Sequence, residues 1–311
     1  MKLIRNLDQL PDSLRHGAVA IGNFDGVHRG HARIIRRMLE RAEELGGPGV
    51  VFTFDPHPIR ILRPERAPPP LTETDRKAEL LVELGVDAVI AYPTDTALLS
   101  MAARQFFDRI IRDRLDARAV VEGPNFFFGH DRLGNIDLLR RLCDDAGIVL
   151  DIVPPLEIDG QIVSSSRIRS LVAAGQVETA RRMLTQPHAI RGVVEHGVGR
   201  GAGLGFPTAN VGQVRTLLPG EGIYAGRAAV DGRVWPAAIS LGGNPTFDEG
   251  RLKIEAYLID FEGDLYGRPV RIDFLARLRD IERFGSVDEL IVQMDRDVAE
   301  ARRIAAQSDD V

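Results

Sequence analysis

The feature that most constrains the fold is a change in the order of the predicted elements near Gln186. Before it, apolar segments typical of buried strands alternate with amphipathic segments typical of helices. After a short predicted helix over Val177–Leu184 and the segment Thr185–Ala189, strands follow one another without helices between them. Alternation predicts a parallel sheet covered by helices, whereas consecutive strands predict an antiparallel barrel or sandwich. We therefore expect two domains, residues 1–186 and 187–311.

The first domain is predicted to be an α/β fold with a parallel sheet. Its expected strands are residues 18–22, 50–54, 87–92, 118–122 and 148–153, and its expected helices are residues 28–45, 77–84, 102–111 and 136–146. Because ligands bind at the carboxyl ends of parallel strands, the loops that follow these strands are the first places to look for a site.

The second domain is predicted to be an antiparallel barrel or sandwich with a terminal helix. Its expected strands are residues 190–195, 223–230, 234–241, 253–260 and 270–275. Asp231-Gly232 between two of them predicts a tight hairpin turn. The terminal helix is expected because apolar residues recur at helical spacing at Val287, Leu290, Ile291, Met294 and Val298.

Charge and composition narrow the classes of partner. The net charge is −5, from 40 basic and 45 acidic residues, which gives no electrostatic reason to expect nucleic acid or an anionic membrane. The single cysteine, Cys143, excludes an intrachain disulfide framework and a cysteine-rich zinc site. No run approaches the ~20 apolar residues of a membrane span, and the N-terminus lacks the apolar core of a signal peptide. We expect a cytoplasmic protein.

The loop after the first predicted strand, in AIGNFDGVHRGHARII, carries two histidines where a helix should begin. His28 and His31 lie three positions apart and therefore on one face of that helix. The free N–H groups of a helix N-terminus suit an anion, and Gly30 lets the backbone approach a ligand. Asp25 beside Gly26 is typical of a turn, and it is also able to contact a ribose or a magnesium ion. The pattern favours a polyphosphate site, with a surface turn or an incomplete metal site as alternatives.

A second candidate phosphate site lies in VSSSRIRSLV, at the start of another expected helix. Serine is an ordinary N-cap. However, Ser164, Ser165 and Ser166 followed by Arg167 and Arg169 offer more donors than a cap uses. Hydroxyl, amide and guanidinium groups together hold phosphate oxygens. A capped helix with solvated arginines is the alternative.

The second domain has its own candidate site in the glycine-rich segment GVGRGAGLGFPTANV. Its glycines allow the backbone to wrap a ligand, although a flexible hairpin explains them equally well. The hydroxyl of Thr208 and the amide carbonyl of Asn210 are hard oxygen ligands that suit Mg²⁺ shared with nucleotide phosphates. Glu255 lies in a predicted strand between Ile254 and Ala256. A buried carboxylate there needs a partner or a task, whereas on an exposed face it would need neither.

Four segments of the first domain, in order, resemble bacterial FAD synthetases. GNFDGVHRGH resembles the HxGH signature of the nucleotidyltransferase superfamily, and VSSSRIR resembles its second phosphate-binding motif. FDPHP and GPNFFFGHDRLGN resemble the flavin-side motifs of the FAD synthetases. The resemblance implies a Rossmann-like parallel sheet and transfer of the adenylyl group of ATP to FMN, with release of pyrophosphate.

The resemblance also implies roles for individual residues of the first domain. It implies that His28 and His31 are catalytic and contact the ATP phosphates, and that His57 and Asn125 position FMN. The serines and Arg169 would hold the departing pyrophosphate from the opposite side. The full set of implied ATP-binding residues is Gly22, Phe24, Asp25, His28, Gly30, His31, Ser164, Ser165, Ser166 and Arg169.

One position departs from the family pattern. Members often carry aspartate, Phe and a polar or basic residue before the final Phe-Gly, whereas this chain has Asn125 and, at the polar position, Phe127. Phe127 therefore weakens the expectation of detailed polar contacts there. Because side chains on an extended run alternate in direction, at least one of the three phenylalanines Phe126 to Phe128 is expected in the core.

The second domain resembles bacterial riboflavin kinase over nearly all of residues 190–297. The segments that carry the resemblance are FPTAN, ISLGGNPTF, KIEAYLIDFEGDLYG and FLARLRDIERFGSVDEL. It implies a small antiparallel barrel, with Glu255 as the general base on the riboflavin 5′-hydroxyl and with Thr208 and Asn210 as Mg²⁺ ligands. The implied ATP-binding residues are Gly197, Gly199, Gly203, Gly205, Phe206, Pro207, Thr208 and Asn210.

Together the two resemblances predict a bifunctional enzyme that makes FMN from riboflavin and then FAD from FMN. The expected cofactor is Mg²⁺, and the expected partners are riboflavin, FMN and ATP, without nucleic acid or membrane; a homo-oligomer is possible. Three rivals stay open. One domain has lost its activity, with Phe127 making the adenylyltransferase the more suspect; or the chain is a flavin- or nucleotide-binding regulator without turnover; or the adenylyl acceptor is different, such as a nicotinate nucleotide. The last rival fits HxGH but not the second domain.

Overall fold

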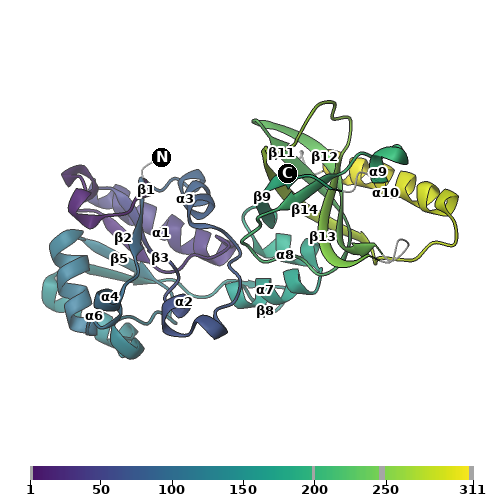
Figure 1. Ribbon diagram of the computed structural model, residues 1–311. Helices are drawn as coiled ribbons and strands as arrows, with labels where there is room; N and C mark the ends of the chain where they lie inside the picture. Colours follow the sequence, from purple (N-terminus) through teal and green to yellow (C-terminus); the bar gives the residue numbers. More distant parts are fainter. Residues whose placement is uncertain (1–2, 198–199, 245–248, 308–311) are drawn as a thin grey trace. The chain divides into compact units, whose positions relative to one another are not determined.

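The computed structural model describes residues 3–197, 200–244 and 249–307, and the chain divides into two compact units (Figure 1). Unit 1 comprises residues 1–68 and 73–164, and unit 2 comprises residues 69–72 and 165–311. This division falls earlier in the chain than the predicted boundary near Gln186, because the helices between them pack with the second unit. The boundary at Gln186 stays a prediction about the sequence domains.

Unit 1 is built on a parallel sheet, as predicted. Among the described residues, six strands lie in the order β1-β4-β3-β2-β5-β6, and every neighbouring pair is parallel. The strands are β1 (Leu3–Ile4), β2 (Ala18–Ile21), β3 (Gly49–Asp55), β4 (Ala88–Pro93), β5 (Ala119–Glu122) and β6 (Val149–Ile152). A hairpin of β7 (Glu157–Ile158) and β8 (Gln161–Ile162) follows β6. The sequence did not indicate β1 or this hairpin.

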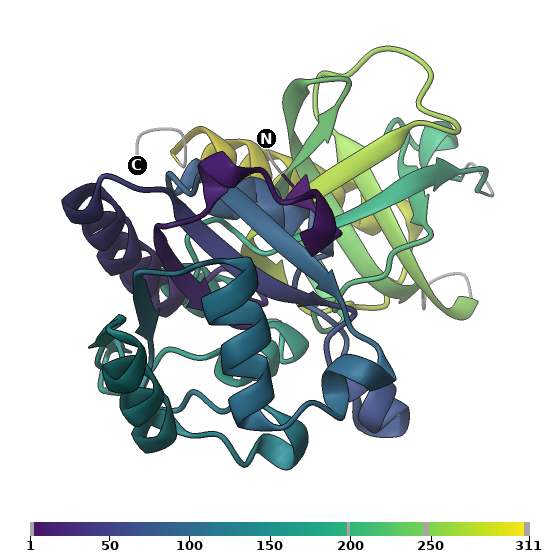
Figure 2. The same cartoon turned by 90° about the vertical axis from the view of Figure 1, so that its left-hand side faces the viewer.

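Helices cover both faces of the sheet (Figure 2). The larger are α1 (Arg29–Leu45), α3 (Thr74–Glu83) and α6 (Ile136–Ala146), and α5 (Ala103–Phe106) continues as a π-helix over Phe107–Arg114. The shorter are α2 (Ile59–Leu62), α4 (Thr96–Leu99) and the 3₁₀ turns Leu7–Gln9, Asp12–Leu14, Pro64–Arg66 and His130–Arg132. The regular helix predicted over 102–111 is therefore wrong in its second half.

The two faces of the sheet bury separate apolar clusters. On one face, Ile35 and Met38 of α1 and Leu81 of α3 pack with the strands in one core cluster. On the other, Phe107 of the π-helix and Leu139 of α6 pack in a second cluster. Residues of β2, β3, β4 and β5 alternate between these clusters, which is why these central strands are largely apolar.

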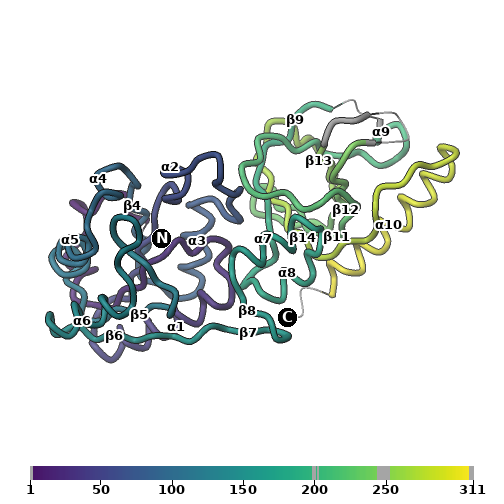
Figure 3. Tube along the Cα trace, turned by 90° about the horizontal axis from the view of Figure 1, so that it is seen from below, coloured from purple at the N-terminus to yellow at the C-terminus, as the bar shows by residue number. Residues whose placement is uncertain are grey.

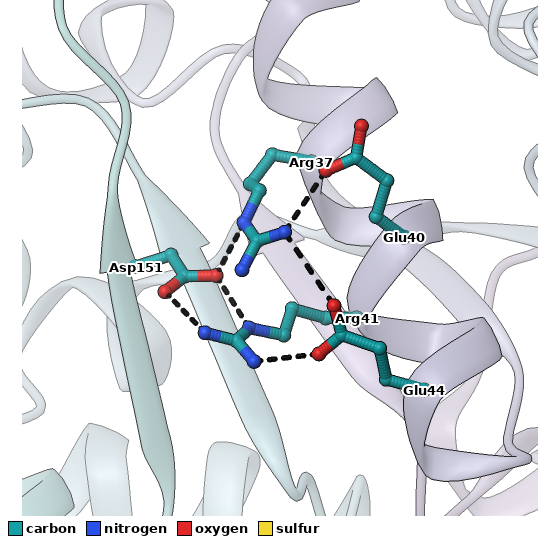
Figure 4. Close-up of polar contacts among 5 residues, drawn as sticks. All are labelled: Arg37, Glu40, Arg41, Glu44 and Asp151. Carbon is teal, nitrogen blue, oxygen red and sulfur yellow. Dashed lines mark hydrogen bonds and ion pairs between the residues drawn. The ribbon is translucent and has the colours of Figure 1, made fainter.

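An ion-pair cluster ties α1 to β6 (Figure 4). Asp151 accepts hydrogen bonds from Nε of Arg37 at 2.7 Å and from Nε and Nη2 of Arg41 at 2.6 and 3.0 Å. The arginines also pair with Glu40 and Glu44 one turn along the helix. The hydrogen bond from Arg41, together with that from Arg37, lowers the pKa of the Asp151 carboxyl below its usual value. The cluster holds α1 beside the last strand.

Unit 2 is a closed barrel, also as predicted. Among the described residues the strand order is β10-β13-β12-β11-β14-β9, with antiparallel neighbours. The strands are β9 (Ala189–Glu195), β10 (Ala209–Gly212), β11 (Gly222–Val230), β12 (Arg233–Asn244), β13 (Glu249–Leu258) and β14 (Pro269–Arg279). The helices are α7 (Ser165–Ala173), α8 (Val177–Met183), α9 (Arg200–Gly203) and α10 (Val287–Gln307). The predicted hairpin turn is confirmed, since Val230 pairs with Arg233 across Asp231-Gly232.

The helix α8 lies against β14 of the barrel, and α7 packs against α8 (Figure 3). Val177 is fully buried in the barrel core, and a carboxylate oxygen of Glu178 accepts the backbone N–H of Arg277 on β14 at 2.9 Å. These contacts explain why the segment that the sequence places in the first domain folds with unit 2. Among the helices that the structure describes, none has the length and apolar character needed to cross a membrane.

Candidate functional sites

The loops that carry the first candidate site leave one edge of the parallel sheet. The strands β3, β2 and β5 are neighbours, so the loops after them share the carboxyl edge. His57 follows β3, is half-buried, and accepts the backbone N–H of Ile59 through Nδ1 at 3.1 Å. Asn125 follows β5 and is exposed. The loop of residues 22–28 follows β2 between them, so the structure groups all three predicted segments at this edge.

The helix α1 begins with a histidine cap. His28 is the N-cap residue, and its Nδ1 accepts the backbone N–H of His31 at 3.2 Å. The two imidazole rings stack with their centroids 3.5 Å apart and their planes at 16°. Because Nδ1 of His28 is the acceptor, the proton of the neutral ring is on Nε2, which is then a donor for a ligand.

Both histidines are held neutral. Burial lowers the pKa of His28 to about 4, although Asp25 opposes the shift. Burial, the neighbouring His28 and the charge of Lys77 all lower the pKa of His31 well below its usual value. At neutral pH the pair therefore offers two uncharged N–H donors. The remaining positive potential comes from the helix N-terminus and from Lys77.

The loop before the helix has a backbone that ordinary residues rarely adopt. Phe24 and Val27 have φ of 47° and 38°, and both side chains are buried. The ring of Phe24 meets that of His31 edge-on at 5.1 Å. A Cβ on Gly30 would lie 3.1 Å from the His28 ring, and one on Gly22 would lie 3.2 Å from the Phe24 ring. Of the residues predicted to bind ATP, Phe24 and both glycines thus shape the histidine pair.

A buried lysine is the functional candidate that the sequence analysis missed. Lys77 on α3 is 6% exposed, and its Nζ donates to Oγ1 of Thr53 at 3.1 Å. Asp25, which is 7% exposed, raises the pKa of Lys77 against the larger lowering by burial. The buried Asp25 therefore influences both Lys77 and His28 electrostatically. The signal for Lys77 was present in its spacing, because it lies three and four positions before the core residues Leu80 and Leu81.

The second phosphate motif begins beside the first. A Cβ on Gly30 would lie 3.6 Å from the carbonyl oxygen of Val163, so the chain entering the serine run passes the start of α1. Ser164 ends unit 1, whereas Ser165, Ser166 and Arg169 belong to α7 in unit 2. Nε of Arg169 donates to the carbonyl of Pro69 at 3.3 Å within that unit. The β7–β8 hairpin lies between β6 and the serines.

The three phenylalanines divide as their alternation predicts. Phe128 is buried in the core, Phe126 packs partly against it, and Phe127 is 45% exposed. The guanidinium of Arg132 lies 4.7 Å from the centroid of the Phe127 ring. An exposed aromatic face capped by a cation therefore occupies the position where the family has a polar residue.

The second candidate site lies on the outer face of the barrel around Glu255. The flanking residues Ile254 and Ala256 face the barrel core, so the Glu255 side chain points outward. Glu255 pairs with Asn210 of β10 on one side and with Ser240 of β12 on the other. Glu255 is therefore neither buried in the barrel core nor on an open face, since it is partly buried and lines a pocket.

The outer face of the barrel around Glu255 forms one wall of a pocket. The pocket lies between the barrel and α10, and Glu255, Phe206 and Thr208 are among the residues that line it. The ring of Phe206 meets that of Tyr257 edge-on at 5.6 Å. The residues that line the pocket are Phe206, Thr208, Ile223, Ala238, Ile239, Ser240, Gly242, Gly243, Lys253, Glu255, Tyr257, Arg279, Ile281, Glu282, Phe284, Leu290, Met294, Asp297 and Val298.

A buried ion pair fixes the helix wall of this pocket. Arg279 of β14 donates to both carboxylate oxygens of Asp297 on α10, at 3.2, 3.1 and 2.8 Å. Nε2 of Gln293 donates to the same carboxylate at 2.9 Å. No local pattern predicts this pair, because Arg279 and Asp297 lie 18 positions apart on different elements.

The glycine-rich loop packs closely against the start of β10. A Cβ on Gly197 would lie 2.0 Å from Nδ2 of Asn210, so any other residue there would displace the Asn210 side chain. Gly203 ends the short helix α9, and Gly205 has a φ of +90°. Pro207 is exposed. Gly199 lies outside the described residues.

The oxygen atoms near Glu255 fit a hard divalent cation. Among the described residues, no group of three or more His, Cys, Asp or Glu side chains is placed to hold a metal ion. Thr208, Asn210 and Glu255 instead supply hydroxyl, amide and carboxylate oxygens on adjoining segments. Mg²⁺ takes few protein ligands of this kind when phosphate oxygens and water complete its shell.

Family models match both halves of the chain. The model described as FAD synthetase matches residues 10–167, and the model described as riboflavin kinase matches residues 184–305. The first range contains the histidine pair and the loops at the sheet edge. The second contains the glycine-rich loop, Glu255 and the pocket.

Curated relatives match over the whole chain. Proteins named bifunctional riboflavin kinase/FMN adenylyltransferase are 39% identical in Pseudomonas fluorescens, with 99% of each chain covered, and 34% identical in Escherichia coli strain K12, with 97% of each covered. The relative of that name in Bacillus subtilis strain 168 is 35% identical, over 92% of this chain and 91% of that protein. A crystal structure from Streptococcus pneumoniae named as a macrolide-efflux protein has a TM-score of 0.85 and 31% identity, and covers 97% of this chain and 98% of that chain.

Proposed function

The chain belongs to the family of bifunctional riboflavin kinases/FMN adenylyltransferases, and from that premise we propose how its residues divide the two reactions. The riboflavin kinase activity transfers the γ-phosphate of ATP to riboflavin and forms FMN. The FMN adenylyltransferase activity joins FMN to the adenylyl group of a second ATP, which forms FAD and releases pyrophosphate. The FAD synthetase half comes first in the chain, so the order of the sites is opposite to the order of the reactions.

We assign adenylyl transfer to the loops at the carboxyl edge of the unit 1 sheet. The FMN phosphate attacks the α-phosphorus of ATP, and this chemistry needs alignment and charge stabilisation rather than a covalent enzyme intermediate. Nε2–H of His28 and the ring of His31 donate to the phosphates at the start of α1. The stacked pair on a capped helix supports this role because it fixes both donors on one face.

The remaining residues predicted for this reaction keep their roles as proposals. Ser164, Ser165, Ser166 and Arg169 bind the pyrophosphate portion. His57 and Asn125 position FMN, and their place in the loops after β3 and β5 supports this assignment. Gly22, Phe24 and Gly30 act by shaping the loop, and Asp25 acts as a buried charge beside His28.

We assign riboflavin phosphorylation to the pocket between the barrel and α10. The observation that carries this assignment is that Glu255 lies with Phe206 and Thr208 in one pocket and opposite Asn210 on the next strand. Glu255 accepts the proton of the riboflavin 5′-hydroxyl as that oxygen attacks the γ-phosphorus, a contribution of roughly 10²–10⁴ in rate for a general base. The glycine-rich loop, including Gly197, Gly203 and Gly205, lies over the ATP phosphates.

Mg²⁺ is the proposed cofactor of the kinase reaction. Thr208 and Asn210 would hold it, and it would neutralise charge on the transferred phosphoryl group. The residues of the chain bind and orient the substrates, and Glu255 accepts the proton. A time course with riboflavin, ATP and Mg²⁺, resolved by chromatography, tests the proposal as a whole. FMN is expected first and FAD second; absence of FAD when FMN is supplied directly would refute the adenylyltransferase assignment.

A further inference from the structure

Lys77 is a charged group inside unit 1 that no role above accounts for. It lies on the face of α3 that carries Leu80 and Leu81 into the core, and it is only 6% exposed. Burying an ammonium group is costly unless it is paired and hydrogen-bonded. A methionine or leucine would fill the same volume at no such cost. The cost of burying this ammonium group suggests that Lys77 has a functional role.

The ammonium group is the first member of a hydrogen-bond relay. Nζ of Lys77 donates to Oγ1 of Thr53 at 3.1 Å, and that hydroxyl donates to the backbone carbonyl of Asn23 at 3.2 Å. Thr53 is fully buried on β3. The relay therefore runs from α3 through the centre of the sheet to the loop that follows β2.

The loop at the end of the relay is the one that carries the histidine pair. Within it Phe24 and Val27 hold positive φ angles. Such backbone persists only where the surroundings over-determine it. The relay ends in a hydrogen bond to the carbonyl of Asn23, which directly precedes Phe24. The loop ends five residues after Asn23, at the N-cap residue His28. Fixing Asn23 therefore helps to fix the direction in which both imidazoles point.

Polar atoms beside the relay also indicate a bound ligand. Among the described residues, Oδ1 of Asn23, Nδ1 of His31 and Oγ1 of Thr94 are buried without a hydrogen-bond partner. The N–H of Thr94 is bonded to the carbonyl of Asp55, two residues beyond Thr53. Buried polar atoms are nearly always satisfied. A substrate at this edge would satisfy them, which places the relay at the wall of the site rather than in inert core.

The inference rests on the proposed phosphate role of His28 and His31. We propose that Lys77 is a positioning residue for adenylyl transfer, which acts through Thr53 on the main chain of Asn23 and so orients the histidine pair toward ATP. Its charge is balanced by Asp25 and Asp55, whose carboxylates both favour the protonated ammonium. Arg5 pairs with Asp55 from outside at 2.8 Å.

The test compares variants that break the relay at its two members. Lys77→Met and Thr53→Val are each expected to lower kcat/KM for ATP in FMN adenylylation by about 10- to 100-fold, mainly by raising KM. The double variant is expected to be no worse than the poorer single variant, because both changes break one relay. Thr53→Ser keeps the hydroxyl and should restore the native KM.

Controls separate positioning from loss of folded protein. Arg76→Met removes a cation from the neighbouring position of α3, where Arg76 pairs with Glu79 and Glu83, and should leave KM for ATP unchanged. Riboflavin phosphorylation by the same molecules reports on unit 2 and should not change. A purely structural lysine would reduce the active fraction, which lowers kcat and leaves KM native.

Each outcome of these measurements supports or overturns the proposed role of Lys77. Native KM in Lys77→Met, or additive effects of the Lys77 and Thr53 changes, would overturn the relay. If Lys77→Met does not fold, the Thr53→Val and Thr53→Ser pair decides alone. If the variant with both His28 and His31 changed to alanine still adenylylates FMN, the proposed function itself is refuted. If that variant loses adenylylation but Lys77→Met keeps the native KM for ATP, only this inference is refuted.

Discussion

The imidazole rings of His28 and His31 stack at 3.5 Å, and the backbone N–H of His31 closes the arrangement by donating to Nδ1 of His28. One contact therefore caps a helix, selects a tautomer and aligns two donors. Burial lowers the pKa of both rings, and Lys77 lowers that of His31 further, so the uncharged pair would suit the proposed role of hydrogen-bond donor to the phosphates. This arrangement leads to the first two predictions.

Replacing His28 and His31 together by alanine should stop FAD formation while FMN formation continues. Removing hydrogen-bond donors aimed at developing charge costs roughly 10²–10³ in rate per donor. FMN is therefore expected to accumulate when riboflavin, ATP and Mg²⁺ are supplied, and chromatography measures it directly. Conversion of FMN to FAD at the native rate would show that the histidines do not act on the phosphates. Replacing the exposed His16, which lies outside all of the predicted motifs, by alanine serves as the control.

Unit 1 should lose stability in acid through His28. Its folded pKa of about 4 lies below the ordinary histidine pKa of 6.5, so the unfolded chain binds the proton first, and stability falls as the pH drops from 6.5 toward 4. Asparagine also caps helices but does not titrate, so His28→Asn should reduce that loss by about 2–3 kcal/mol at pH 4.5. Urea unfolding at pH 7 and pH 4.5 measures the difference. Equal pH dependence in both proteins would contradict the assignment.

Changing Glu255 to glutamine should abolish riboflavin phosphorylation with little change in structure. The amide cannot accept the hydroxyl proton, and the rate is expected to fall by roughly 10²–10⁴. FMN supplied directly should still become FAD. The matched control is Glu300→Gln, since Glu300 lies on the exposed side of α10 in an ion pair with Arg303. Normal FMN production by the Glu255 variant would exclude it as the base.

Changing Thr208 to valine should weaken the metal requirement of one reaction only. Valine keeps the shape but removes the hydroxyl oxygen, so the Mg²⁺ concentration for half-maximal riboflavin phosphorylation should rise by about tenfold or more. The Mg²⁺ dependence of FMN adenylylation in the same protein should stay native. An equal shift in both reactions would indicate an effect on Mg-ATP in solution or on the whole chain.

Changing Asp151 to asparagine should destabilise unit 1 by about 1–2 kcal/mol. The side chain is 18% exposed and accepts bonds from Arg37 and Arg41, so the variant leaves both guanidinium groups without their shared carboxylate. Urea, which does not screen charge, is the appropriate denaturant. Asp145→Asn, at an exposed position of α6, controls for the loss of one negative charge. A native midpoint for the Asp151 variant would show that the cluster contributes nothing measurable.

Local patterns predicted most of the fold. The period of apolar residues separated the parallel sheet from the antiparallel barrel, and it located α1 and α6 within one residue. The strand β10 was missed because its four residues, Ala209–Gly212, include Asn and Gly and show no apolar run. The π-helical turn after Phe106 depends on tertiary packing, which periodicity does not record.

Candidate site residues were recognised from the sequence where their arrangement is chemically unusual. Two histidines at a helix start and a glutamate between apolar neighbours are unusual enough to be noticed in one sequence. Lys77 was not recognised from the sequence, because a lysine in the first turns of a helix is usually exposed. Only the folded structure shows that this one is buried. The Arg279–Asp297 pair joins a strand to a helix, and only the folded barrel brings them together.

The attachment of α8 to the barrel changes where this molecule can be divided. A gene fragment that starts at Pro187 would encode every strand of the barrel, yet it would remove Val177 from the apolar interior and Glu178 from the main chain of Arg277. A cut at Ser165 keeps α7 and α8 with the barrel, but it removes from the adenylyltransferase half the residues Ser165, Ser166 and Arg169, which we propose to bind pyrophosphate. A single cut therefore cannot give each activity all of the residues proposed for it.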